Sequence, residues 1–285
     1  MICINCKKQM NSHFTKNTFR IVKCTACKLM GVENIPEDLS KYYSKGYFTG
    51  DVSLDGYMNY DLEKELTKKS YERQLDIIEK YLSRKSDIDL FEIGCATGFF
   101  MSLAEERGLN VEGIDISEYA VSKAIEKGLS VCATTFESYE TKNKFDVVVM
   151  QDVIEHVASP VDYIIKSRNV LREGGLIAFT TPDSGSFWAK FWGKKWHAFV
   201  PPQHLFYFSS KNLSCIIESN GFNVVYSGHH GKRFSIPYIV RLLYSWTGLK
   251  VFSKLAEWST KSFLKNISLP INLYDTLFII AKKSK

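Results

Sequence analysis

A strand, a glycine turn and a helix follow one another between residues 88 and 107, and this succession constrains the fold more than any other feature. Residues 88–93 form an apolar run that predicts a buried strand, which leads into the turn Gly94-Cys95-Ala96-Thr97-Gly98 and then into an apolar-faced helix. This arrangement is the nucleotide-binding start of a doubly wound sheet. The sequence therefore predicts a Rossmann-like α/β fold.

An acidic residue ends the next predicted strand, which covers residues 111–115. Asp115 follows Gly94 by 21 positions, near the spacing at which a carboxylate reaches the ribose hydroxyls of a bound adenosine. The dinucleotide pattern G-x-G-x-x-G is not met, because Ala96 stands where backbone must approach a pyrophosphate and no third glycine follows in place. The spacing favours an adenosine cofactor other than NAD or FAD.

The turn resembles the first motif, acid-x-Gly-x-Gly-x-Gly, of the class I S-adenosylmethionine-dependent methyltransferase family, with alanine at the middle glycine. The resemblance covers roughly residues 42–283. It implies S-adenosyl-L-methionine as cofactor and a seven-stranded sheet of six parallel strands and a last antiparallel one, with helices on both faces. It also implies a set of cofactor-binding residues: Glu92, Gly94, Cys95, Ala96, Gly98, Asp115, Ile116, Thr135, Phe136, Gln151 and, from a preceding segment, Tyr57 and Tyr60.

The later strands are assigned from the same resemblance. Residues 145–150 are similar to the family's fourth strand and residues 176–182 to its fifth, while residue 222 opens a sixth and residues 274–281 form a seventh. Before the fifth strand, Gly174 and Gly175 are expected to reverse the chain with positive φ at the end of a helix.

Four of the seven cysteines form the pattern C-x2-C-x17-C-x2-C near the N-terminus. Each short pair is typical of a tight knuckle, and two knuckles close a tetrahedral thiolate site. Neighbouring lysines would offset the negative charge of such a site. The spacing predicts a structural Zn²⁺, and two chance CxxC pairs in a reduced protein are the alternative. The predicted metal ligands are Cys3, Cys6, Cys24 and Cys27.

Length and composition suit one catalytic core with small additions. The 285 residues are 45% hydrophobic and 24% charged, which is the balance of a folded globular protein. We expect a zinc ribbon at residues 1–34, an N-terminal helical cap segment at 35–86, and a methyltransferase domain at 87–285 with a helical insertion at about 232–270. The lack of a signal peptide or an 18-residue apolar run predicts a cytoplasmic location.

Charge is concentrated at the two ends of the chain. Residues 1–34 carry six basic and one acidic side chain, residues 230–285 carry ten and two, and the middle carries 21 and 28. Within the insertion, residues 250–265 predict a helix with lysines on one face and apolar side chains on the other. Such a helix either packs on its own domain, which we favour, or makes peripheral contact with the inner face of a membrane.

Two histidines are candidates for the proton acceptor that a hydroxyl or amine substrate needs. His156 follows the fourth strand, and His204 lies in a Pro-Pro-Gln-His segment that is expected to return over the acceptor side. The alternatives are a purely structural role, with His156 capping a turn and His204 filling a polar niche, and binding of the acceptor without proton transfer. A loop with Trp188, Trp192 and Trp196 forms either an aromatic wall for the substrate or a lid packed on the core.

Three functions follow from these features. The first is methylation of a small-molecule acceptor, foremost O-methylation of a sugar in a glycan precursor, as in polysaccharide biosynthesis, or of a quinone-like or lipid-linked compound. The second is an rRNA base methyltransferase that holds RNA with the ribbon and the basic ends. The third is a non-catalytic cofactor-binding regulator. The acidic middle argues against nucleic acid as a partner, and intact Glu92, Gly94 and Asp115 argue against loss of activity.

Overall fold

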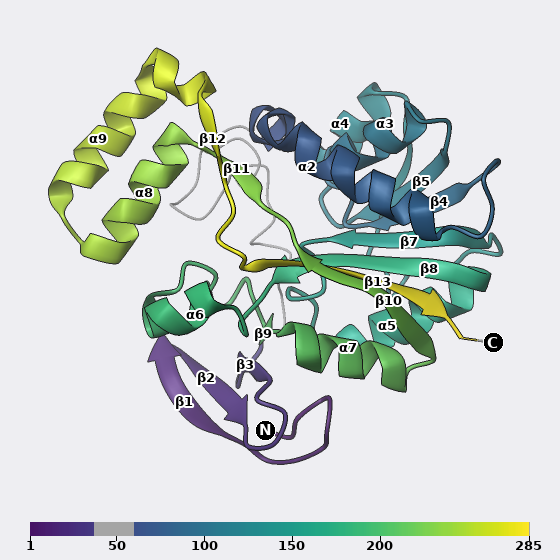
Figure 1. Cartoon of the computed structure of the whole chain (residues 1–285), viewed down its shortest axis with the longest axis horizontal. Coiled ribbons are helices and arrows are strands. Elements are labelled where there is room, and N and C mark those ends of the chain that lie inside the picture. The colour runs from purple at the N-terminus through teal and green to yellow at the C-terminus, as the bar shows by residue number, and fades with distance from the viewer. Residues whose placement is uncertain (37–59, 285) are drawn as a thin grey trace.

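The computed structural model describes residues 1–36 and 60–284, and within them a seven-stranded sheet forms the centre of the molecule (Figure 1). The sheet is built from apolar runs that pair into long ladders. Its strands are β4 (Asp89–Ile93), β5 (Asn110–Asp115), β6 (Ser130–Ala133), β7 (Phe145–Gln151), β8 (Leu171–Pro182), β10 (Phe222–His229) and β13 (Thr276–Lys283).

The strand order is β10-β13-β8-β7-β4-β5-β6. Pairs β8–β7, β7–β4, β4–β5 and β5–β6 are parallel, whereas β13 runs antiparallel to both β8 and β10. The prediction of six parallel strands and a last antiparallel one is confirmed.

Helices cover both faces of this sheet, because its strands are apolar on both sides. On β7, Val148 and Met150 face one core and Val147 and Val149 face the other. Figure 1 shows α2, α3 and α4 above the sheet and α5 and α7 below it. The helices are α2 (Tyr60–Tyr81), α3 (Phe99–Glu105), α4 (Glu118–Glu126), α5 (Pro160–Val170) and α7 (Ser210–Ser219).

Local signals set where these helices begin. Pro160 occupies the first turn of α5, where a missing N–H costs nothing. Ser209 caps α7, because its side-chain oxygen accepts a hydrogen bond from the Asn212 N–H. In turn, Asn212 Oδ1 accepts a hydrogen bond from the Ser209 backbone N–H. The chain therefore enters each of these helices at a defined residue.

The prediction for the turn before the fifth strand is right for one glycine and wrong for the other. Gly174 has φ +71°, but Gly175 is not among the residues with positive φ. Residues 171–175 belong to β8 and not to the helix end, because the strand begins at Leu171. At this end of the sheet, the Asp146 carboxylate accepts hydrogen bonds from the Asp89 N–H (3.0 Å) and from Arg172 Nη1 (2.7 Å).

A second, four-stranded sheet holds the N-terminal segment, in the order β1-β2-β3-β9. The first three strands are β1 (Met10–Lys16), β2 (Phe19–Cys24) and β3 (Met30–Val32). The fourth, β9 (Phe206–Tyr207), comes from a segment more than 170 residues later and pairs antiparallel with β3. The pairing of β3 with β9 therefore joins the cysteine-bearing segment to the remainder of the fold (Figure 1).

Two further segments extend from the main sheet. Helix α6 (Phe187–Trp192) and the 3₁₀ turn η2 (Gly193–Lys195) follow β8. Between β10 and β13, strands β11 (Lys232–Ser235) and β12 (Ser268–Ile271) pair with each other and enclose α8 (Ile236–Thr247), α9 (Lys250–Lys261) and η3 (Phe263–Asn266). In Figure 1, α8 and α9 stand apart from the main sheet. Across the described residues, no helix has the length and apolar character of a membrane span.

Candidate functional site

The glycine turn lies at the carboxyl ends of β4 and β5. The N–H groups of Gly94 and Cys95 both donate to the Ile114 carbonyl, at 2.8 and 3.0 Å. Gly94 has φ +73°, and a Cβ on it would lie 2.5 Å from Val153; Gly98 has φ +78°, and its Cβ would lie 2.2 Å from Leu129. Both positions therefore require glycine, and the turn brings the backbone close to the end of the sheet.

The Asp115 carboxylate is fixed at the end of β5 by backbone amides. Oδ2 accepts from the Ala96 N–H at 2.9 Å, and Oδ1 accepts from the Ser117 N–H at 2.8 Å. Burial raises the pKa of Asp115, while the amides of Ser117, Ala96 and Ile116 act in the opposite direction. The carboxylate is thus oriented before a ligand arrives, and each oxygen keeps a lone pair for a hydroxyl donor.

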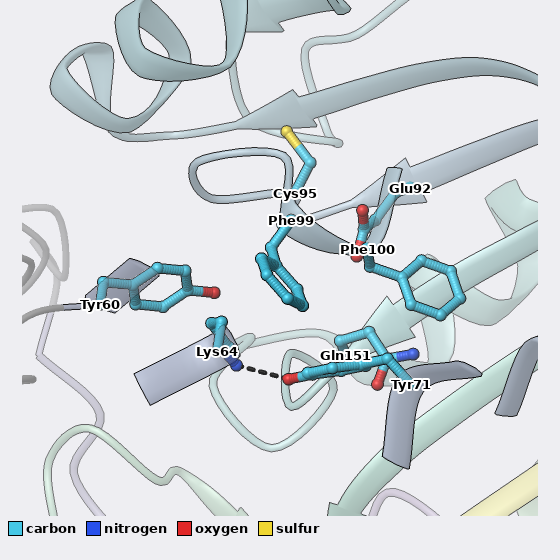
Figure 2. A pocket seen from close by; sticks show the side chains of 9 residues that line it. Tyr60, Lys64, Tyr71, Glu92, Cys95, Phe99, Phe100 and Gln151 are labelled. Atoms are coloured by element: carbon cyan, nitrogen blue, oxygen red, sulfur yellow. Dashed lines mark hydrogen bonds between the residues drawn. The ribbon is translucent and has the colours of Figure 1, made fainter. Parts of the chain in front are cut away.

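A pocket opens beside the turn and is lined on one side by side chains of α2 (Figure 2). It brings together five of the predicted cofactor residues from four segments: Tyr60, Glu92, Gly94, Cys95 and Gln151. Its lining does not include the predicted Ala96, Gly98, Asp115, Ile116, Thr135 or Phe136. Tyr57 lies outside the described residues.

Glu92 is the buried acid of this pocket. Its side chain is 2% exposed, and Oε2 has no hydrogen-bond partner within the described part of the chain. Burial raises the pKa of Glu92 well above its usual range, and the positive charge of Lys64 acts against this rise. A buried acceptor of this kind favours a ligand that brings donors, such as the ammonium of an amino acid. These residues fit the methionine portion of S-adenosyl-L-methionine.

Four residues of the lining were not predicted from the sequence. Phe99 and Phe100 begin α3 directly after the turn, and Lys64 and Tyr71 lie on the α2 face that also carries Tyr60. Lys64 Nζ donates to the Tyr71 hydroxyl at 2.6 Å, as the dashed line in Figure 2 shows. Tyr60, Lys64 and Tyr71 have the spacing i, i+4, i+11, which places them on one helix face. This spacing was the sequence signal from which Lys64 and Tyr71 could have been predicted.

Beyond Asp115, the predicted adenine-side residues differ in exposure. Ile116 is exposed, and Thr135 is exposed with its hydroxyl bonded to Ser138. The Phe136 ring is 1% exposed and packs edge-on against Tyr163, with ring centroids 5.2 Å apart. Its side chain is therefore part of the core, and contact of residue 136 with the cofactor, for which the backbone amide is one route, stays a prediction.

His156 and His204 do not line the pocket; their rings lie next to each other, with centroids 4.7 Å apart. His156 Nδ1 bonds to the Gln203 carbonyl at 2.9 Å, and His204 Nδ1 bonds to the Ala198 carbonyl at 2.8 Å. Because a carbonyl only accepts, Nδ1 carries the proton in each neutral ring and Nε2 carries the lone pair.

The electrostatics of this pair favour neutral imidazoles. Burial lowers the pKa of His156, whereas the hydrogen bond to the Gln203 carbonyl and the negative charge of Asp152 act in the opposite direction. Burial, and then the neighbouring His156, lower the pKa of His204 further. The buried Glu155 carboxylate lies 3.9 Å from His156 Nε2, beyond hydrogen-bond range. Glu155 therefore does not orient His156 as a catalytic dyad would require.

The four N-terminal cysteines converge on one point. Sγ of Cys3 lies 3.4 Å from that of Cys27, Sγ of Cys6 lies 3.3 Å from that of Cys24, and all four lie within 4.8 Å of one another. Sulfurs bound to zinc at about 2.3 Å in tetrahedral geometry are about 3.8 Å apart. The four thiols are therefore placed as a tetrahedral metal site needs.

The tryptophan segment is divided between core and surface. Trp196 is fully buried, and its Nε1 donates to Asp275 Oδ2 at 3.0 Å. Trp188 and Trp192 are partly buried against the same core, whereas Phe187 and Phe191 are exposed. Trp196 is a core residue, so an aromatic substrate wall of the predicted kind does not include it.

Two known proteins are similar to this chain in sequence. A Bradyrhizobium protein named ubiquinone biosynthesis O-methyltransferase is 28% identical over 175 residues, which are 54% of this chain and 68% of that protein. A protein of the same name from Roseobacter denitrificans is 32% identical over 126 residues, but the match spans 38% of this chain and about half (51%) of that relative.

Among known structures, magnesium protoporphyrin IX methyltransferase from Synechocystis, with bound S-adenosylhomocysteine, superposes with a TM-score of 0.56. The match covers 86% of this chain and 98% of that one at 14% identity, so it shows the fold alone. Residues 62–227, more than half of the chain, match the family described as "Methyltransferase domain". The chain belongs to this family of class I S-adenosylmethionine-dependent methyltransferases.

Proposed function

We propose that this methyltransferase acts on a hydroxyl oxygen of a small-molecule acceptor. The observation that carries the methyl-transfer part of the proposal is the pair of acidic side chains at the ends of β4 and β5. Glu92 Oε2 has no hydrogen-bond partner among the described residues, and backbone amides orient Asp115. The O-methyltransferase names of the curated relatives support oxygen as the methylated atom.

In this proposal Glu92 and the turn hold the methionine portion of the cofactor, and Asp115 binds the ribose. S-adenosyl-L-methionine, when bound, supplies a methyl group already activated on a cationic sulfur. The protein then aligns the acceptor and removes its proton. His156 suits the second task, because its Nδ1–H is fixed by Gln203 and its lowered pKa keeps Nε2 unprotonated at neutral pH.

Two acceptor classes are tested by one assay. A phenolic hydroxyl of a quinone precursor is the first, because the relatives are named for ubiquinone biosynthesis. A sugar hydroxyl of a glycan precursor is the second, as the sequence favours. With radiolabelled cofactor, we expect a methyl ether on a quinone precursor or on a lipid-linked sugar. Label in total RNA, with an affinity that falls steeply as salt rises, would instead support an RNA enzyme.

The insertion adds a surface suited to a lipid-linked acceptor. Val251, Leu255 and Trp258 of α9 are 63%, 41% and 57% exposed, and Phe263 of η3 is 74% exposed. Their exposure does not support the favoured expectation that this apolar face packs on its own domain. Next to them, three lysines of α9 are exposed, with one glutamate: Lys250, Lys254, Lys261 and Glu257. An apolar stripe flanked by lysines suits an anionic bilayer surface.

We predict that the wild-type chain binds vesicles with anionic phospholipid and that Lys250→Glu with Lys254→Glu lowers the binding constant about 30-fold or more, since each lysine contributes about 1 kcal/mol at such a surface. Flotation of protein over a range of vesicle concentrations measures this constant. The matched control is Lys142→Glu with Lys144→Glu, a charge change far along the chain from α9. If both double variants float with vesicles to the same extent, α9 does not contribute to membrane binding.

We also propose that Cys3, Cys6, Cys24 and Cys27 hold one structural zinc ion. Metal analysis of the purified chain is expected to give about one zinc per chain, and Cys24→Ser is expected to abolish it because three thiolates bind far more weakly. Cys215→Ser, at an exposed thiol on α7, is the control and should keep the metal. Protein purified without chelator that contains no zinc would contradict this assignment.

A further inference from the structure

The four-cysteine unit and the loop with His156 are joined by one continuous set of backbone hydrogen bonds. Strand β3 pairs with β9, and the Val32 N–H donates to the Leu205 carbonyl at 2.8 Å. On its other side, the Leu205 N–H donates to the Glu155 carbonyl at 2.8 Å, and the Phe206 N–H donates to the same carbonyl at 3.1 Å. Residue 205 therefore bridges β3 and the residue that precedes His156.

The same segment holds the His156 ring. The Gln203 carbonyl accepts from His156 Nδ1, so it sets both the tautomer and the direction of Nε2. Residues 203–206 thus fix the histidine twice, through its ring and through the backbone of its neighbour Glu155.

Side-chain packing follows the same path. Cys3, Cys24 and Leu29 are buried in the same core cluster as Leu205 and Phe206. The approach of β3 to β9 is close, because a Cβ on Gly31 would lie 3.2 Å from the Phe206 ring and 3.3 Å from the Leu205 carbonyl oxygen. A larger side chain at Gly31 would push β9 away without touching a thiol.

We propose that the N-terminal four-cysteine unit is a positioning element of the acceptor side of the site. Metal binding at the thiols orders β3, β3 holds residues 203–206, and these residues hold His156. Residues Gly31 and Leu205 are the positioning residues of this connection. The inference rests on the proposed function, in which His156 contacts the acceptor hydroxyl.

Amide hydrogen exchange tests the connection without an acceptor. Removing zinc from the wild-type chain, or the variant Cys24→Ser, is expected to speed exchange of residues 153–157 and 203–208 about 10-fold or more, and added zinc should restore protection in the wild type only. Exchange in β4 and β5 should stay unchanged. Unaltered exchange of residues 203–208 in metal-free protein would overturn the proposal, whatever the reaction of this enzyme is.

The variant Gly31→Val separates positioning from metal binding. It should keep zinc and bind S-adenosylhomocysteine with a dissociation constant within about 2-fold of wild type, yet lower kcat about 10-fold and speed exchange of residues 203–208. Ser12→Val, on the opposite edge strand β1, is the matched control and should behave as wild type. Faster exchange together with wild-type kcat would also overturn the proposal. A wild-type chain without any turnover would instead contradict the proposed function alone, since the exchange result stands by itself.

Discussion

His156→Asn is expected to lower kcat about 100-fold while leaving the affinity for S-adenosylhomocysteine nearly unchanged. The Asn side-chain amide can still donate to the Gln203 carbonyl, so the local hydrogen bond is kept and only the basic nitrogen is lost. Steady-state turnover on the identified acceptor measures kcat, and calorimetry measures the affinity.

The pH profile gives an independent check on this role. Burial lowers the pKa of His156, so the ring stays neutral until the pH falls below the ordinary histidine value of about 6.5. The acid limb of kcat in the wild type should therefore lie below pH 6.5, and activity should be lost as the pH falls through the pKa of the enzyme complex.

His204→Ala, which removes the edge contact with His156, should lower kcat by a smaller factor. If His156→Asn keeps wild-type kcat, the proton leaves by another route.

Asp115→Ala is expected to weaken cofactor binding about 10-fold or more. The carboxylate is held by the Ala96 and Ser117 amides, so it is ordered before the ribose arrives, and a charge-assisted bond to two hydroxyls is worth more than a neutral one. The loss also leaves the Ala96 N–H without its present acceptor.

Titration calorimetry with S-adenosylhomocysteine measures this effect. Asp89→Ala is a suitable control, because Asp89 lies at the opposite end of β4, in an ion pair with Arg172 at 2.7 Å. The control should keep its affinity even if it lowers stability. Equal affinity of Asp115→Ala and the wild type would place the ribose elsewhere.

The main sheet could be predicted because its determinants are local. The apolar runs of β4, β7 and the second half of β8 are buried on both faces, and each run ends at a turn signal. Gly94 and Gly98 mark a turn that other residues cannot make, and Asp115 follows at the spacing set by one helix and one strand. Fold and cofactor class follow from these residues.

The acceptor side could not be predicted in the same way, because it depends on contacts between distant short segments. Strand β9 has two residues and β3 has three, too few for any periodic pattern. Their pairing decides where Gln203 and Leu205 lie relative to His156. The sequence also does not show which aromatic residues of one segment are buried: Trp196 lies in the core, whereas Phe187 lies at the surface.

Calorimetric titration of the wild-type chain with S-adenosylhomocysteine tests the central claim most directly, because it needs no knowledge of the acceptor. The account predicts one site per chain with a dissociation constant in the micromolar range, or about −8 kcal/mol, and no binding of NAD. A folded chain that gives no heat with S-adenosylhomocysteine or S-adenosyl-L-methionine would contradict the account.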